Sequence, residues 1–336
     1  MKQCREIGDP HQNSGGDTSL RASPLMPSQK FERRKWVYIT GRGHSGSTVL
    51  DAMLGNAEDI ESVGELVSGM GRYEDKCSCG VKFRNCSYWK SARALFEEIA
   101  GAKWDDAVRA MTGQAHIRAF PRTLFANARN PWVTELAEYF ESMAAAIGNN
   151  HTMVVDSSKE VTRALFLLRF VPGTKVIHLV RHPARILQSN YYRIEKGRGI
   201  KILRHTFKPK KLVFPFLVAS CIMWFVGNLL AELARQFSRK NVLRVRYEDI
   251  VRSPDQELAR IEKFIGVSLD KVKKNIRESR SFQVGHNIGG NHMRMAGEFV
   301  FDSQGGKRTG LPKRYEIITV LLCWPLLLMY GYYKGQ

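Results

Sequence analysis

The chain contains the stretch Trp36-Val37-Tyr38-Ile39-Thr40-Gly41-Arg42-Gly43-His44-Ser45-Gly46-Ser47-Thr48-Val49-Leu50, which decides its fold class. The first five residues favour a β-strand, and residues 48–54 are compatible with a helix. Between them, residues 41–48 have the spacing G-x-x-x-x-G-S-T. Such a loop turns successive backbone N–H groups toward a phosphate and places it at the positive end of the next helix. We therefore predict a phosphate-binding loop at residues 41–48.

Three later apolar runs are typical of buried parallel strands, and helical segments separate them. The predicted strands cover residues 153–155, 175–180 and 242–245, and the predicted helices cover residues 91–112, 131–147, 160–170 and 254–265. Alternation of strand and helix predicts an α/β fold with three layers, α/β/α, around a central parallel sheet.

Position 47 of the loop separates two kinds of nucleotide-binding protein. The Walker pattern has a lysine there, which neutralises the phosphates of a triphosphate, whereas this chain has Ser47. The serine argues against hydrolysis of ATP or GTP. A small-molecule kinase remains the second hypothesis, because Asp156 follows an apolar run and could hold Mg²⁺ as a Walker B aspartate does.

The 336 residues carry a large positive charge, with 52 Lys and Arg against 32 Asp and Glu, a net +20. This surplus predicts an anionic partner but does not choose among nucleic acid, acidic lipid, polyanionic glycan and phosphorylated cofactor. A non-catalytic binder of such a partner is the third hypothesis. We predict that residues 1–34, which are mostly polar, form a flexible arm. Because they lack the apolar run of a signal peptide, we expect a cytoplasmic protein.

Two apolar stretches follow or precede basic residues. Residues 212–231 contain no charge and are long enough to span a bilayer, but they lie between two predicted strands of one sheet, which favours a buried or membrane-dipping helix. Residues 313–336 form a separate apolar segment after a domain at 35–312. A peripheral contact with an anionic membrane and a cover over a lipid-like acceptor are the two interpretations of this segment.

The loop resembles the 5′-phosphosulfate loop of the sulfotransferases that use 3′-phosphoadenosine 5′-phosphosulfate (PAPS). Residues 181–193 resemble the family's 3′-phosphate site, and residues 246–250 its R-Y-E-D-L segment, whose Tyr packs near the adenine. Residues 286–294 resemble the late glycine-rich loop that closes over the 3′-phosphate end. The resemblance covers residues 36–294 and is closest to the bacterial, tyrosylprotein and glycan-type branch.

This resemblance implies the sulfotransferase variant of the P-loop-containing nucleotide-hydrolase fold, with PAPS as donor and no metal. The acceptor would be a hydroxyl group of a carbohydrate, a glycolipid or another small molecule, and no nucleic-acid partner is expected. The residues implied to bind PAPS are Gly43, Ser45, Gly46, Ser47, Thr48, Arg181, Ser189, Arg193, Tyr247, Asn291 and Arg294.

The resemblance also suggests the catalytic residues. The family usually has Lys or Arg at the loop position that meets the bridging oxygen, and here that position is His44, with Arg42 as the alternative cation. Glu65 resembles the catalytic carboxylate of the tyrosylprotein and glycan-type members, which would take the proton of the acceptor hydroxyl. Lys159 resembles a second cation facing the sulfuryl group.

Three cysteines, Cys77, Cys79 and Cys86, lie close together in the sequence. Three thiolates could hold zinc, but no fourth ligand follows at a usual spacing. A conditional disulfide and ordinary reduced thiols are the other two interpretations, and the sequence favours the reduced thiols.

Overall fold

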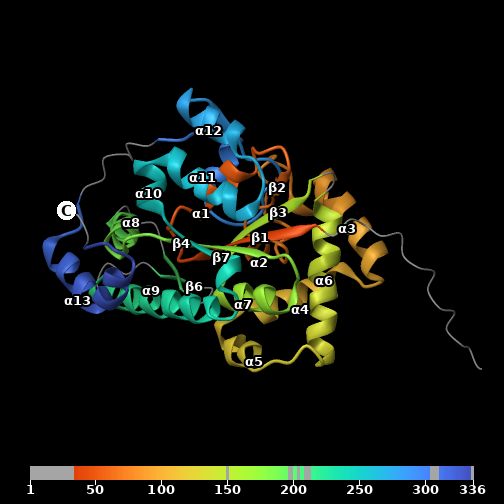
Figure 1. Cartoon of the computed structure of the whole chain (residues 1–336), viewed down its shortest axis with the longest axis horizontal. Coiled ribbons are helices and arrows are strands. Elements are labelled where there is room, and N and C mark those ends of the chain that lie inside the picture. The colour runs from red at the N-terminus through yellow and green to blue at the C-terminus, as the bar shows by residue number, and fades with distance from the viewer. Residues whose placement is uncertain are drawn as a thin grey trace, which may run out of the picture. The chain divides into compact units, whose positions relative to one another are not determined.

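A five-stranded parallel sheet forms the centre of the fold (Figure 1). The computed structural model describes residues 34–148, 151–195, 200–202, 205–207, 213–302 and 310–333. The strand order is β2-β3-β1-β4-β7, with every neighbouring pair parallel. The strands are β1 (Lys35–Gly41), β2 (Ile60–Ser62), β3 (Met153–Lys159), β4 (Lys175–Val180) and β7 (Val242–Arg246). All four strands predicted from the sequence are present, and β2 is an additional strand.

Alternating side chains of β1 point to opposite faces of the sheet, and helices cover both faces. This arrangement confirms the predicted three layers. On one face, Trp36 and Tyr38 pack with α3 (Ser87–Ala100), α4 (Trp104–Ala115), α6 (Pro131–Ile147) and α7 (Val161–Phe170). On the other face, Val37 and Ile39 pack with α1 (Ser47–Leu54), α10 (Tyr247–Arg252), α11 (Pro254–Ile265) and α12 (Asp270–Arg277). Figure 1 shows α10 to α12 above the sheet and α7 below it.

One predicted helix is wrong, because residues 91–112 do not form a single helix. Helix α3 ends at Gly101, whose φ of 60° is left-handed, and α4 begins at Trp104. A glycine in this conformation ends a helix without steric cost. The other predicted helices correspond to α6, α7 and α11, with ends that agree within a residue.

Two long apolar helices pack beside α8 (Pro183–Glu195). They are α9 (Val213–Arg235) and α13 (Lys313–Met329), which share a hydrophobic cluster built on Cys221, Trp224 and Cys323. Helix α9 is long and apolar enough to cross a membrane by length and composition, with 22% of its most apolar window buried. It lies in the chain between β4 and β7, which pair with each other, so the chain before it and the chain after it contribute strands to the same sheet.

The remaining elements are short. They are α2 (Leu66–Gly69), α5 (Phe120–Leu124), the pair β5 (Ile200–Ile202) and β6 (His205–Phe207), the pair β8 (Ser281–Gln283) and β9 (Glu298–Val300), and 3-10 turns at Phe83–Asn85, Ile117–Ala119, Arg239–Asn241 and His292–Ala296. The predicted N-terminal arm lies outside the described residues, except Arg34, which donates to the carbonyl of Ala145. The described residues all belong to one unit, Glu32–Gln336, and this unit includes α13.

The strand order fixes where a ligand can bind. Strand β3 lies on one side of β1 and β4 on the other, so the chain changes direction across the sheet at β1. In open α/β sheets the crevice beyond the carboxyl ends of the strands at such a point is the usual ligand site. The predicted phosphate loop begins at this end of β1, which makes the crevice the candidate active site.

Candidate active site

The loop from Gly41 to Ser47 joins β1 directly to α1. Gly46 precedes the helix with a φ of 94°, and no side chain caps the first turn of α1. A Cβ on Gly46 would lie 2.2 Å from the ring of Tyr247, so only glycine fits there. The hydroxyl of Ser45 is buried and has no hydrogen-bond partner within the described structure. An uncapped helix start beside an unsatisfied hydroxyl is suited to binding an anion.

Arg181 and Tyr247 lie together against this loop. Arg181 follows β4, and its guanidinium donates to the carbonyl oxygen of His44 at 2.9 Å while lying 4.6 Å from the centre of the Tyr247 ring. The structure thus brings two residues predicted from distant motifs to the same loop. Ser189 is buried in α8, and the side chain of Arg193, in the same helix, lies outside the described residues.

Glu65 and Lys159 form an ion pair next to the loop. Glu65 precedes α2, and Lys159 ends β3 with a φ of 76°. The ammonium group of Lys159 contacts Oε1 of Glu65, and the hydroxyl of Ser68 donates to Oε2 at 3.1 Å. Thr40, the residue before the loop, donates to the carbonyl oxygen of Lys159 at 3.0 Å. The two catalytic residues proposed from separate parts of the sequence are therefore neighbours at one end of the sheet.

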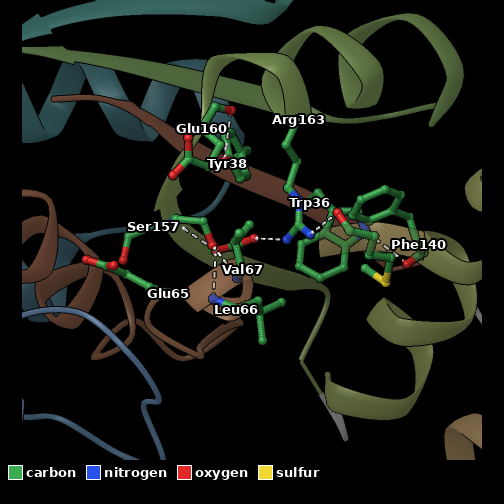
Figure 2. Close-up of polar contacts among 12 residues, drawn as sticks. Trp36, Tyr38, Glu65, Leu66, Val67, Phe140, Ser157, Glu160 and Arg163 are labelled. Atoms are coloured by element: carbon green, nitrogen blue, oxygen red, sulfur yellow. Dashed lines mark hydrogen bonds and ion pairs between the residues drawn. The ribbon is translucent and has the colours of Figure 1, made fainter. Parts of the chain in front are cut away.

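A buried network holds the two residues that follow Glu65, Leu66 and Val67 (Figure 2). The carboxylate of Asp156 accepts from the backbone N–H of Leu66 at 3.3 Å and from the guanidinium of Arg163 at 3.2 Å. The N–H of Val67 donates to Ser158 at 2.9 Å. Burial raises the pKa of Asp156, although the charge of Arg163 acts in the opposite direction. Asp156 therefore supports the helix after Glu65 and is not directed at a metal, as a Walker B aspartate would be.

The two candidate cations of the loop are placed differently. The guanidinium of Arg42 lies against α9, 4.0 Å from the sulfur of Met223. Burial lowers the pKa of Arg42, and the negative charge of Glu160 opposes this effect. His44 has a left-handed φ of 68°, and its carbonyl group is held by Arg181. Whether His44 or Arg42 is the cation that meets the bridging oxygen stays a prediction.

The late loop, residues 286–294, lies beside Glu65. Ile288 pairs with Gly64, and the carbonyl oxygen of Ile288 accepts from the N–H of Glu65 at 2.7 Å. Arg294 donates to the carbonyl oxygen of Lys76 at 2.7 Å, and the side chain of Asn291 accepts from Met293. The late loop thus lies beside the residues that follow β2, and two strands, β3 and β1, separate β2 from β4, the strand before Arg181. The 3′-phosphate role of Asn291 and Arg294 stays a prediction.

His286, at the start of this loop, was not predicted from the sequence as a partner of the three cysteines. Its ring lies with Cys77, Cys79 and Cys86, and the ligand atoms of the four residues all lie within 4.8 Å of one another. The expectation of no fourth ligand considered neighbouring positions only, whereas His286 and Cys86 are 200 positions apart. The fold brings the two segments together through the pairing of the late loop with residues 62–64.

A parallel α/β sheet with a glycine-containing loop between its first strand and first helix, and a lysine–carboxylate pair beside that loop, is typical of proteins of the phosphate-loop class. The model of the sulfotransferase family matches residues 37–271, and the chain belongs to this family. Membership of this family argues against the kinase and the non-catalytic binder. The predicted family and fold are thereby confirmed.

Individual relatives are distant. Carbohydrate sulfotransferase 1 of Danio rerio is 34% identical over 126 residues, a match spanning 34% of this chain and 29% of that protein. The sulfotransferase domain of the Synechococcus PCC 7002 olefin synthase is 19% identical with a TM-score of 0.44, covering 89% of this chain and 96% of that chain. The sulfotransferase domain of the curacin biosynthetic pathway is 17% identical with a TM-score of 0.46, covering 87% and 97%.

Proposed function

We propose that the enzyme transfers a sulfuryl group from PAPS to the hydroxyl group of a carbohydrate, glycolipid or similar small molecule. The observation that carries this proposal is the buried hydroxyl of Ser45 at the uncapped start of α1, which has no hydrogen-bond partner among the described residues. A buried polar group almost always has a hydrogen-bond partner. An oxygen of the 5′-phosphosulfate group would supply it, and the N–H groups of residues 43–48 would hold the other oxygens.

The rest of the donor extends from the loop toward β4 and α8. Arg181 presents a planar fork of donors that matches phosphate oxygens, and it already lies against the loop. Arg181, Ser189 and Arg193 together bind the 3′-phosphate in this proposal, and Tyr247 packs near the adenine. A carbohydrate acceptor agrees with the name of the Danio rerio relative, carbohydrate sulfotransferase 1, which is similar to part of this chain.

Catalysis requires a base for the acceptor and cations for the transferred group. The oxygen of the acceptor attacks sulfur in line, the bond from sulfur to the bridging oxygen breaks, and the acceptor proton passes to Glu65. Lys159 faces the sulfuryl oxygens, and His44 stabilises the charge that develops on the bridging oxygen. A sulfuryl group carries less charge than a phosphoryl group, so these side chains can stabilise the transition state without a metal in this proposal.

Calorimetric titration with adenosine 3′,5′-bisphosphate (PAP), the desulfated product, tests the donor. We expect PAP to bind in the presence of EDTA, because the loop and Arg181 supply the phosphate contacts. ATP with Mg²⁺ is the control and should bind far more weakly, since the loop has Ser47 in place of the Walker lysine. Binding of ATP with Mg²⁺ and none of PAP would contradict the proposed donor.

We also propose that α9 and α13 rest on the cytoplasmic face of an anionic membrane. Their outer sides expose large apolar side chains, among them Met223 at 51%, Leu321 at 66% and Trp324 at 55%. Lys313 and Arg314 are exposed at the start of α13. An apolar face flanked by cations is suited to adsorption on acidic lipids. Since Arg42 of the loop contacts α9, the membrane would lie near the active site.

Sedimentation with lipid vesicles tests this contact. The protein should bind vesicles that contain phosphatidylglycerol more strongly than neutral vesicles. The double variant Leu321→Gln, Trp324→Gln should lose most of this binding, whereas Val300→Gln, an exposed apolar residue in the opposite layer, should keep it. Equal behaviour of both variants would favour the other interpretation, in which the apolar helices cover a lipid-like acceptor.

A further inference from the structure

Three thiols and one imidazole meet outside the proposed donor site. Sγ of Cys86 lies 3.7 Å from Sγ of Cys79 and 3.4 Å from Nδ1 of His286. Sγ of Cys77 lies 3.8 Å from the same nitrogen. Cys77 and Cys86 are buried, and Cys79 is exposed at the edge of the group. Four soft or borderline ligand atoms at one point form a set that proteins use for metals.

The distances agree with tetrahedral coordination. Zinc binds sulfur at about 2.3 Å and imidazole nitrogen at about 2.0–2.1 Å. A tetrahedron with these bond lengths separates two sulfurs by about 3.8 Å and a sulfur from a nitrogen by about 3.6 Å. The three separations above lie within a few tenths of an ångström of these values. The ligand atoms of the four residues all lie within 4.8 Å of one another, so the remaining pairs need to close by about 1 Å at most to bind one ion.

The local backbone presents the cysteines in a tight hairpin. The N–H of Cys77 donates to the carbonyl oxygen of Val81 at 2.8 Å, and the N–H of Gly80 donates to that of Cys77 at 2.9 Å. Gly80 has a φ of 88°, which favours glycine at this turn. Such a hairpin places two thiols on one side of a turn, and Cys86 joins them after a single 3-10 turn.

Two contacts hold His286, one to its backbone and one to its ring. The indole N–H of Trp89 donates to the carbonyl oxygen of His286 at 2.9 Å. The ring of Tyr88 stacks on the imidazole, with centroids 4.7 Å apart and planes 2° from parallel. Both aromatic residues begin α3, directly after Cys86. Since outer contacts of this kind position a metal ligand, Nδ1 is held toward the thiols before any ion binds.

We propose that Cys77, Cys79, Cys86 and His286 bind a zinc ion in a closed, structural site. Three thiolates and one imidazole in a tetrahedron suit zinc better than magnesium, calcium or manganese, which prefer oxygen ligands. The four protein ligands fill the coordination sphere, so the ion has no open position for chemistry. Arg294 donates to the carbonyl oxygen beside Cys77 and provides a nearby positive charge for the thiolates.

The ion would fix one wall of the active site. His286 is followed by Asn287, which donates to the buried carboxylate of Asp51 at 2.8 Å, and by Ile288, which holds the N–H of Glu65. Gly290 lies against Glu65, where a Cβ would be 3.0 Å from Oε1. Zinc would join the cysteine hairpin to this loop and so position the carboxylate. Binding of the metal does not depend on which donor the enzyme uses.

Metal analysis of the purified full chain tests the site. Protein expressed with added zinc should contain about one zinc ion per chain. Cobalt substituted for the zinc should give the intense visible absorption of a tetrahedral site with thiolate ligands. Cys79→Ser, which changes the exposed ligand, should lower the zinc content and the melting temperature. The matched control is Cys323→Ala, a buried thiol in another hydrophobic cluster, and it should keep the zinc.

Two outcomes would overturn the proposal. One is wild-type protein that neither retains zinc nor takes it up after reduction, with no tetrahedral cobalt spectrum. The other is a disulfide between Cys79 and Cys86, detected by peptide mass spectrometry of protein purified with zinc and without reductant. Since these measurements use neither PAP nor an acceptor, their failure is distinguishable from a failure of the proposed sulfuryl transfer.

Discussion

The variant Glu65→Gln should lower the turnover number by about 10²- to 10⁴-fold while PAP affinity stays near the wild-type value. Glutamine has the same shape and still accepts a hydrogen bond from Ser68, but it cannot take the proton of the acceptor hydroxyl. The donor site should be unaffected, because Glu65 lies outside the phosphate loop and contacts Lys159 and residues 288–290 instead. Release of PAP over a panel of carbohydrate acceptors measures turnover, and calorimetry measures PAP affinity.

The same substitution at Glu61 is the matched control. Glu61 lies on β2, four positions before Glu65, and its carboxylate pairs with His151 at 3.2 Å rather than with Lys159. Glu61→Gln should keep its turnover. Wild-type turnover in Glu65→Gln would remove Glu65 from the mechanism, whereas an equal loss in both variants would assign the effect to the local fold.

The sequence predicted the fold well where local pattern and burial agree. The run before Gly41 alternates between two buried faces, and parallel strands buried on both sides are continuously apolar, so four strands were recognisable. Strand β2 has three residues, Ile60-Glu61-Ser62, and is too short for such a pattern. The break at Gly101 was overlooked because apolar residues continue on both sides of it, in α3 and α4.

The site was predictable in its parts but not in its contacts. Glu65 and Lys159 were each identified from the sequence, yet their pairing depends on β2 and β3 being neighbours, which is a property of the sheet order. The support from Arg163 was missed, although an arginine within the apolar run of α7 was a signal that it needs a buried partner. His286 could be found only in three dimensions.

The variant Arg181→Ala should weaken PAP binding by about 2–4 kcal/mol, the usual effect of removing one member of a buried charge pair. This corresponds to a roughly 30- to 1,000-fold higher dissociation constant. The guanidinium lies between the loop and Tyr247, so it can reach a phosphate group without a large movement. Arg181→Lys should recover only part of the affinity, because lysine keeps the charge but lacks the planar fork. Calorimetry in EDTA measures all three proteins.

Arg185→Ala is the control that separates a specific contact from the general effect of charge. Arg185 lies four positions further on, in α8, and is exposed; its guanidinium contacts Gln188 at 3.4 Å. Both variants remove one positive charge from a chain of net charge +20 and therefore change the long-range attraction of an anion about equally. Only Arg181 contacts the loop, so a large loss confined to Arg181→Ala would identify a phosphate contact. Equal, small losses in both variants would mean that the donor is attracted by the overall charge and that its 3′-phosphate binds elsewhere.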